Sequence, residues 1–155
     1  MNRGMSQLSI RKAGEADIQI IAEFNRKLCR ELEARDLDEE TILAGVGNLL
    51  KRPEQGFHLV AELDGEVVGC SLITGEWSDW SNGVFWWVKS VYVSTSARRQ
   101  GVNRKLYAYA RELAKSMDDV RGIRVYIGEQ NRAATVAYKA LGLKEMPRRM
   151  FEERF

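Results

Sequence analysis

The sequence predicts a mixed α/β fold, and three observations support this class. Strand-like apolar runs alternate along the chain with helical patterns of apolar residues spaced three and four apart. Asp64-Gly65 stands between two strand-like runs, as in a two-residue hairpin. A third strand-like run leads through an arginine-rich turn into a helix pattern over residues 91–104. The 155 residues suffice for one domain with a buried core, so we expect a single domain over residues 1–155.

Two helices are expected in the first third of the chain. Residues 7–12 fit a short strand, and a helix opens at residues 14–17 with apolar residues spaced for one buried stripe. Asp38 or Thr41 could cap a second helix, because both side chains can accept a hydrogen bond from a first-turn amide. That helix should end by Pro53, which cannot continue it.

Three strands should follow. The runs 57–63 and 66–74 flank the hairpin turn, and residues 76–83 read as a loop or strand end. The next strand, 84–93, is long and rich in aromatic residues. Its apolar residues change from even to odd positions near 89–90, where a one-residue bulge would keep both sets on one face of the sheet.

The remaining elements are a helix over 102–117 with one apolar face, a short strand over 123–127, and a helix over 132–141. The last helix has an asparagine cap before it and a glycine just past its end, which are ordinary helix boundaries. Residues 143–151 are expected to form a last strand.

Composition excludes several classes of protein. The 24 basic and 22 acidic residues give a net charge of +2, which does not favour nucleic-acid or membrane binding. No apolar run approaches the roughly 20 residues of a membrane helix, and no secretion signal is recognised at the start of the sequence. Cys29 and Cys70 lack metal or redox spacing and lie in apolar patterns, so buried reduced thiols and a cytoplasmic location are expected.

The arginine-rich turn predicts an anion site. Arg98, Arg99 and Gly101 lead directly into a helix, whose first amides have no intrahelical acceptor and carry positive potential. Gly101 lets the backbone approach a ligand closely. The GxxxxGK[ST] spacing of P-loop NTPases does not occur here. A plain connection with solvated arginines is the alternative reading.

Two blocks of the sequence resemble the GNAT superfamily of N-acetyltransferases, which use acetyl-coenzyme A. Arg98-x-x-Gly101 after an apolar strand is similar to the signature Arg/Gln-x-x-Gly-x-Gly/Ala, with Asn103 in place of the last small residue. The later block of that family is matched, with Leu in place of a final Phe, at Asn131, Ala134, Tyr138, Gly142 and Leu143.

The resemblance implies a GNAT fold: a mixed, mostly antiparallel central sheet flanked by about four helices, with a splayed strand pair that holds the cofactor. Strand backbone groups would bind pantetheine, and amides of the turn would bind the pyrophosphate. The implied cofactor-binding residues are Val91, Tyr92, Val93, Arg98, Arg99, Gln100, Gly101, Val102, Asn103, Arg104, Asn131 and Tyr138.

Two residues are implied catalytic candidates. Tyr138 would be the acid, because a phenol with a pKa of about 10 can donate to a thiolate whose thiol has a pKa of about 8.5. Ring packing against the sheet is its alternative role. Glu76 is the candidate base, with Asp79 as the alternative, because the position of the glutamate in many relatives reads Lys89-Ser90 here. Both acids could instead be solvated loop residues.

The aromatic residues near these acids leave two readings open. Trp77, Trp80, Trp86 and Trp87 could bind a cation through their rings, or could pack in the core and in a dimer. His58 is the one histidine, and without a recognisable partner neither a catalytic role nor a metal site is expected there.

The expected function is therefore transfer of an acetyl group from acetyl-CoA to a primary amine of a small molecule or peptide, without a metal. The acidic and aromatic loop residues favour a cationic amine. Acetylation of a protein N-terminus or lysine, and a non-catalytic acyl-CoA-binding module, are the alternatives. No nucleic-acid or membrane partner is expected, and a homodimer is left open.

Overall fold

The computed structural model describes residues 6–155, which divide into two compact units on either side of the boundary between Val125 and Tyr126. The described part of the larger unit is built on a five-stranded sheet in the order β1-β2-β3-β4-β5. The strands are β1 (Leu8–Lys12), β2 (Gly56–Leu63), β3 (Glu66–Ser78), β4 (Gly83–Val93) and β5 (Val120–Val125). The first four pair antiparallel and β5 pairs parallel to β4, so the predicted mostly antiparallel sheet is confirmed.

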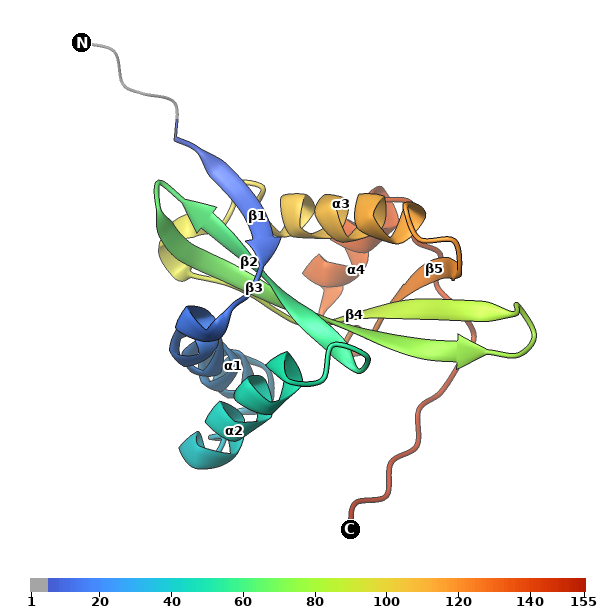
Figure 1. Cartoon of the computed structure of the whole chain (residues 1–155), viewed down its shortest axis with the longest axis horizontal. Helices are drawn as coiled ribbons and strands as arrows, with labels where there is room; N and C mark the ends of the chain where they lie inside the picture. Colours follow the sequence, from blue (N-terminus) through green and yellow to red (C-terminus); the bar gives the residue numbers. More distant parts are fainter. Residues whose placement is uncertain (1–5) are drawn as a thin grey trace. The chain divides into compact units, whose positions relative to one another are not determined.

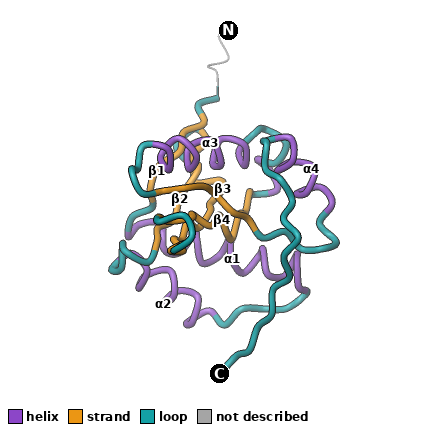
Figure 2. The backbone as a smooth tube through the Cα atoms, turned by 90° about the vertical axis from the view of Figure 1, so that its right-hand side faces the viewer, coloured by secondary structure: helices purple, strands orange, loops and turns teal. Residues whose placement is uncertain are grey.

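Helices cover both faces of this sheet (Figure 1). The helices α1 (Ile18–Glu33) and α2 (Glu39–Leu50) lie on one face, and α3 (Val102–Lys115) lies on the other. Figure 2 shows the strands as a layer between α3 and the α1–α2 pair. Asp38 caps α2 by accepting a hydrogen bond from the Thr41 amide at 2.8 Å, which decides between the two predicted caps.

The sheet therefore has a buried core on each face. Leu59 and Val60 are both fully buried, although neighbouring strand residues point to opposite faces. Leu59 packs with Leu106 of α3, and Val60 packs with Ile21 and Phe24 of α1. Burial on both faces explains why the centre of β2, Leu59-Val60-Ala61, is continuously apolar rather than alternating.

The predicted bulge in β4 is confirmed. Cys70 pairs with Tyr92 and Leu72 pairs with Lys89, so the three residues 70–72 of β3 lie opposite the four residues 89–92 of β4. Ser90 adopts the left-handed conformation, with φ of +49°, at this point. Beyond the bulge, Val91 and Val93 pack on the α3 side with Val88, while Tyr92 is turned to the other face against Phe24.

Three strand predictions differ from the structure. β3 runs on to Ser78 instead of ending at residue 74, because its pairing with β4 continues to Ser78 opposite Gly83. β5 covers Val120–Val125 instead of 123–127, because pairing with β4 begins at Val120, which the local pattern does not reveal. Residues 143–151 form no strand, since Pro147 cannot donate to a ladder and charged residues surround it.

The smaller unit contains α4 (Arg132–Ala140), as predicted. Its start is capped by Asn131, whose Oδ1 accepts a hydrogen bond from the Ala134 amide at 3.1 Å. Its end is closed by Gly142, which has φ of +94°, and by the Leu143 amide, which donates to the Tyr138 carbonyl at 3.1 Å. A glycine in this conformation with that hydrogen bond is a common helix ending.

Candidate functional site

The turn between β4 and α3 presents an uncapped helix start. After the 3-10 turn Thr95–Ala97, Arg99 and Gly101 both adopt left-handed conformations, with φ of +62° and +78°. Gly101 is the N-cap of α3, where no side chain accepts from the first amides, and the first turn carries no acidic residue. Because these amides point out of the helix with the positive end of its dipole, the turn is suited to bind an anion.

The space in front of α3 is open. A Cβ built on Gly101 would meet no heavy atom within 4 Å. Gly69 of β3 brings the helix start close to the sheet, because a Cβ there would lie 3.0 Å from the Tyr92 carbonyl oxygen and 3.1 Å from Cγ1 of Val102. The sequence reasoning missed Gly69, although a glycine inside a strand often marks a close approach of this kind.

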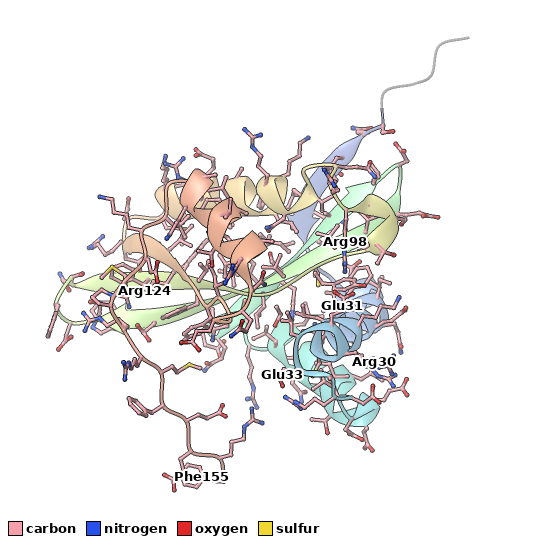
Figure 3. The ribbon with its side chains drawn as sticks, turned by 180° about the vertical axis from the view of Figure 1, so that it is seen from behind. Arg30, Glu31, Glu33, Arg98, Arg124 and Phe155 are labelled. Carbon is pink, nitrogen blue, oxygen red and sulfur yellow. The ribbon has the colours of Figure 1, made fainter. Side chains whose placement is uncertain are left out.

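The charge of Arg98 is already paired with a carboxylate of the protein. Its Nη2 donates to both carboxylate oxygens of Glu31 on α1 at 2.9 Å, and its Nε donates to the Val93 carbonyl at 2.9 Å (Figure 3). The carboxylate raises the pKa of the Arg98 guanidinium above its ordinary value. The side chain thus ties the end of β4 to α1, and the exposed Arg99 and Arg104 are the better partners for a phosphate.

The edge of β4 beyond the bulge carries the other predicted cofactor residues. The register between β4 and β5 ends where Val88 pairs with Val125. Val91, Tyr92 and Val93 lie past that point, so β5 does not pair with them in the register. This is where an extended ligand could bond to a strand as an additional strand does. Their contact with a cofactor stays a prediction.

A cavity of about 510 Å³ lies on the α1–α2 face of the sheet and reaches the β4 bulge. We call it the His58 cavity. Its described lining residues are Asn25, Ile42, Gly45, Val46, Leu49, Gln55, His58, Leu72, Thr74, Gly75, Lys89 and Ser90. His58 is 5% exposed, and burial lowers the pKa of its imidazole to about 4, so the ring is neutral at pH 7.

No local pattern in the sequence indicates that His58 lines a cavity. The residues that join it in the cavity come from α1, α2, β3 and β4, and Lys89 and Ser90 stand some thirty positions later in the chain. The strand registers bring them together, because His58 pairs with Leu72 and Leu72 pairs with Lys89.

The structure keeps Glu76 apart from the bulge. Its Oε1 accepts from Nη1 of Arg124 at 2.7 Å, and the Arg124 guanidinium also lies 3.8 Å from the centre of the Phe85 ring. Glu76 pairs with Phe85, five positions before Ser90 on β4, which is about 17 Å along a strand. The base role of Glu76 stays a prediction, and this separation and ion pair weigh against it, as does the still more distant position of Asp79.

The tryptophans do not form one cation-binding group. Trp86 is buried and packs edge-on against Phe57, with ring centres 5.5 Å apart, so it belongs to the core. Trp77 and Trp80 are 62% and 90% exposed near the tip of the β3–β4 hairpin. Trp86 therefore packs in the core, as one of the two predictions had it. Trp77 and Trp80 are not among the residues that line the His58 cavity.

The remaining site candidates stand on α4. Asn131 acts as the helix cap, which is compatible with a further contact to a ligand. Tyr138 follows seven positions later, about two helical turns away on the same face. The cofactor contact of Asn131 and the acid role of Tyr138 both stay predictions.

The described residues also bear on metals, membranes and thiols. Over residues 6–155, no three or more His, Cys, Asp or Glu side chains are grouped so that they could hold a metal ion. None of the helices in that range is both long and apolar enough to cross a bilayer. Cys29 and Cys70 are buried free thiols, as predicted, and burial raises the pKa of Cys70 to about 12.

The buried His58 predicts an acid-sensitive stability. Its pKa of about 4 in the folded chain lies below the ordinary value of 6.5, so its contribution is complete above pH 6.5 and is lost as the pH falls toward 4. The full loss is about 3 kcal/mol. The test compares the free energies of unfolding of wild type and of His58→Gln. We expect the value for wild type, relative to that for the variant, to fall by about this amount from about pH 7.5 to about pH 4.

Denaturant unfolding of both proteins measures this difference. Asp17 does not alter this difference. A hydrogen bond from Arg11 lowers the pKa of Asp17, so the stability that its carboxylate contributes is lost only as the pH falls below the ordinary value of 3.8, and equally in both proteins. A difference that stays constant over this range would show that His58 is not held neutral by the fold.

Comparison with known proteins adds the following. The sequence pattern of the Acetyltransferase (GNAT) family matches residues 19–143. A possible acetyltransferase from Clostridium difficile 630 is similar in structure, with 34% identity, a TM-score of 0.88, and coverage of 96% of this chain and 97% of that chain. A search of curated proteins finds no significant match.

Two more distant structures share the fold. Aminoglycoside N-acetyltransferase AAC(6')-Iy in complex with CoA has 18% identity, a TM-score of 0.79 and 99% coverage of both chains. Glucosamine-6-phosphate N-acetyltransferase from Arabidopsis thaliana has 16% identity, a TM-score of 0.74, and coverage of 95% of this chain and 98% of that chain.

Proposed function

Because the chain belongs to the GNAT family of acetyltransferases, we propose that it transfers an acetyl group from acetyl-CoA to a primary amine of a small molecule. The observation that carries the proposal is the open, uncapped start of α3 beside Arg99 and Arg104. The acetyltransferases that share the fold, one with an aminoglycoside and one with an amino sugar phosphate in its name, support an amine as the class of acceptor, and at 18% and 16% identity they do not set its polarity or its number of amines.

The residues of this chain fit coenzyme A. The amides at Gly101 to Arg104 would hold the pyrophosphate, since no acidic residue in the first turn repels it. Arg99 and Arg104 would contact the further phosphate or lie along the adenine. Backbone groups of Val91 to Val93 would hold pantetheine beside the β4 bulge.

Acetyl-CoA would supply the acetyl group as a thioester. The amine must be neutral when it attacks, because its lone pair forms the new C–N bond as the C–S bond breaks. One proton leaves the amine and one reaches the sulfur, so the transfer is balanced. Tyr138 would hold the proton for the sulfur at its hydroxyl, and an amide near Val91 or Tyr92 would stabilise the carbonyl oxygen.

The proposal keeps the wider expectations from the sequence. The family match over residues 19–143 runs through both compact units, which supports one functional domain over residues 1–155. Buried free cysteines fit a reducing, cytoplasmic location. A homodimer stays open.

We expect coenzyme A to bind with micromolar affinity, on the order of −8 kcal/mol. Arg104→Gln should weaken binding about two- to fivefold, because it removes one exposed cation beside the anion. Arg111→Gln, the same change further along α3, is the matched control and should leave the affinity unchanged. Isothermal titration calorimetry with coenzyme A measures all three proteins. No measurable heat with wild type would contradict the proposal.

A further inference from the structure

The lining of the His58 cavity has an unusual chemistry for a pocket that would receive amines. Its walls include four aliphatic side chains, Ile42, Val46 and Leu49 from α2 and Leu72 from β3. None of the described lining residues is an aspartate or glutamate, and the charged one is Lys89. The other polar lining residues, Asn25, Gln55, Thr74 and Ser90, are uncharged. A second ammonium group in this cavity would therefore meet the like charge of Lys89 and no carboxylate as counter-ion, which is unfavourable.

His58 and the bulge face the same cavity. His58 pairs with Leu72, and Leu72 pairs with Lys89, so the three side chains lie on the same face of the sheet. His58 on β2 is two strand spacings from Lys89 on β4, which is about 10 Å across the sheet. A small-molecule acceptor fits in this cavity, which His58, Lys89 and Ser90 all line, since cavities of this volume commonly bind such ligands. The imidazole is buried and stays neutral at pH 7, so one ring nitrogen is a hydrogen-bond acceptor.

We propose that the His58 cavity is the acceptor pocket, that it selects a primary monoamine with an apolar body, and that His58 accepts a hydrogen bond from the amine nitrogen. This rests on the proposed acetyl transfer. A cavity without carboxylates does not stabilise an ammonium, so it favours the neutral amine that can attack the thioester. The sequence favoured a cationic amine because of Glu76 and the exposed tryptophans, and none of these residues lines this cavity.

A matched pair of acceptors tests the selection. Hexylamine and hexamethylenediamine have the same chain and differ by the second amine. With acetyl-CoA as donor, we expect kcat/KM for hexylamine to exceed that for the diamine by at least about tenfold. Equal values, or a preference for the diamine, would overturn the assignment.

Two variants locate the selection in the cavity. Leu49→Glu puts a carboxylate on its α2 wall and should lower the hexylamine preference at least about tenfold, while Leu43→Glu, the same change on α2 outside the lining, should not. His58→Gln should raise KM for hexylamine about tenfold and leave the affinity for coenzyme A unchanged. An unchanged KM in His58→Gln, or an unchanged preference in Leu49→Glu, would contradict the proposal.

A direct readout separates this proposal from the general one. The chain has one histidine, so its imidazole NMR signals are unambiguous. Hexylamine added to the protein loaded with coenzyme A should shift them. If coenzyme A binds and amines are acetylated but the His58 signals do not move, the cavity assignment is wrong and acetyl transfer stands. If coenzyme A does not bind, both proposals fall.

Discussion

Gly101→Glu is expected to reduce the affinity for coenzyme A at least about 100-fold. Gly101 caps α3 with φ of +78°, and a side chain there would extend into the open space in front of the helix amides. A carboxylate in this space would occupy the anion site and repel the pyrophosphate. Calorimetric titration with coenzyme A measures the loss.

Two controls separate charge from backbone strain. Gly65 in the β2–β3 turn also has positive φ, +87°, and open space around its Cβ position, so Gly65→Glu adds the same charge and similar strain away from the site. It should bind coenzyme A as wild type does. Gly101→Ala should lose far less affinity than Gly101→Glu. Binding by Gly101→Glu at wild-type affinity would remove the pyrophosphate assignment.

Tyr138→Phe is expected to lower kcat by roughly 10²–10³-fold. The substitution removes one hydroxyl and keeps the ring, so the fold and the affinity for coenzyme A should change little. The loss follows if the hydroxyl provides the proton that the departing sulfur receives. Steady-state kinetics with a confirmed amine acceptor measures kcat, and calorimetry measures the affinity for coenzyme A.

Tyr109→Phe is the matched control for this prediction. Tyr109 lies on α3 and is 38% exposed, so loss of its hydroxyl should not affect turnover. A lower affinity for coenzyme A at unchanged kcat in Tyr138→Phe would show that Tyr138 binds rather than donates a proton. Wild-type kinetics in Tyr138→Phe would exclude it as the acid.

Local signals predicted much of the fold. The shift from even to odd apolar positions predicted the β4 bulge, because side chains alternate strictly along a strand and only an inserted residue changes their phase. The cap at Asn131 and the glycine at Gly142 predicted the bounds of α4 for a similar reason, since both act within a few residues. The end of β3 and the start of β5 were missed because pairing with β4 sets them.

The same distinction separates the two parts of the site. The arginine-rich turn is continuous in sequence. Its glycine and the helix start after it predicted an anion site without any knowledge of the tertiary structure. The Arg98–Glu31 ion pair joins residues 67 positions apart, and the His58 cavity collects residues from five elements, α1, α2, β2, β3 and β4. Neither arrangement leaves a local pattern, so the side-chain partner of Arg98 and the place of His58 emerged only with the strand registers and the helix packing.

Acetyl transfer itself is the most direct test of this account. Purified protein is incubated with acetyl-CoA and a panel of primary amines, while thiol release and the mass of each amine are followed together. We expect thiol release that depends on the amine and matches, mole for mole, the amount of acetylated product. Binding of coenzyme A without amine-dependent release across the panel would contradict the account and indicate a non-catalytic acyl-CoA-binding protein.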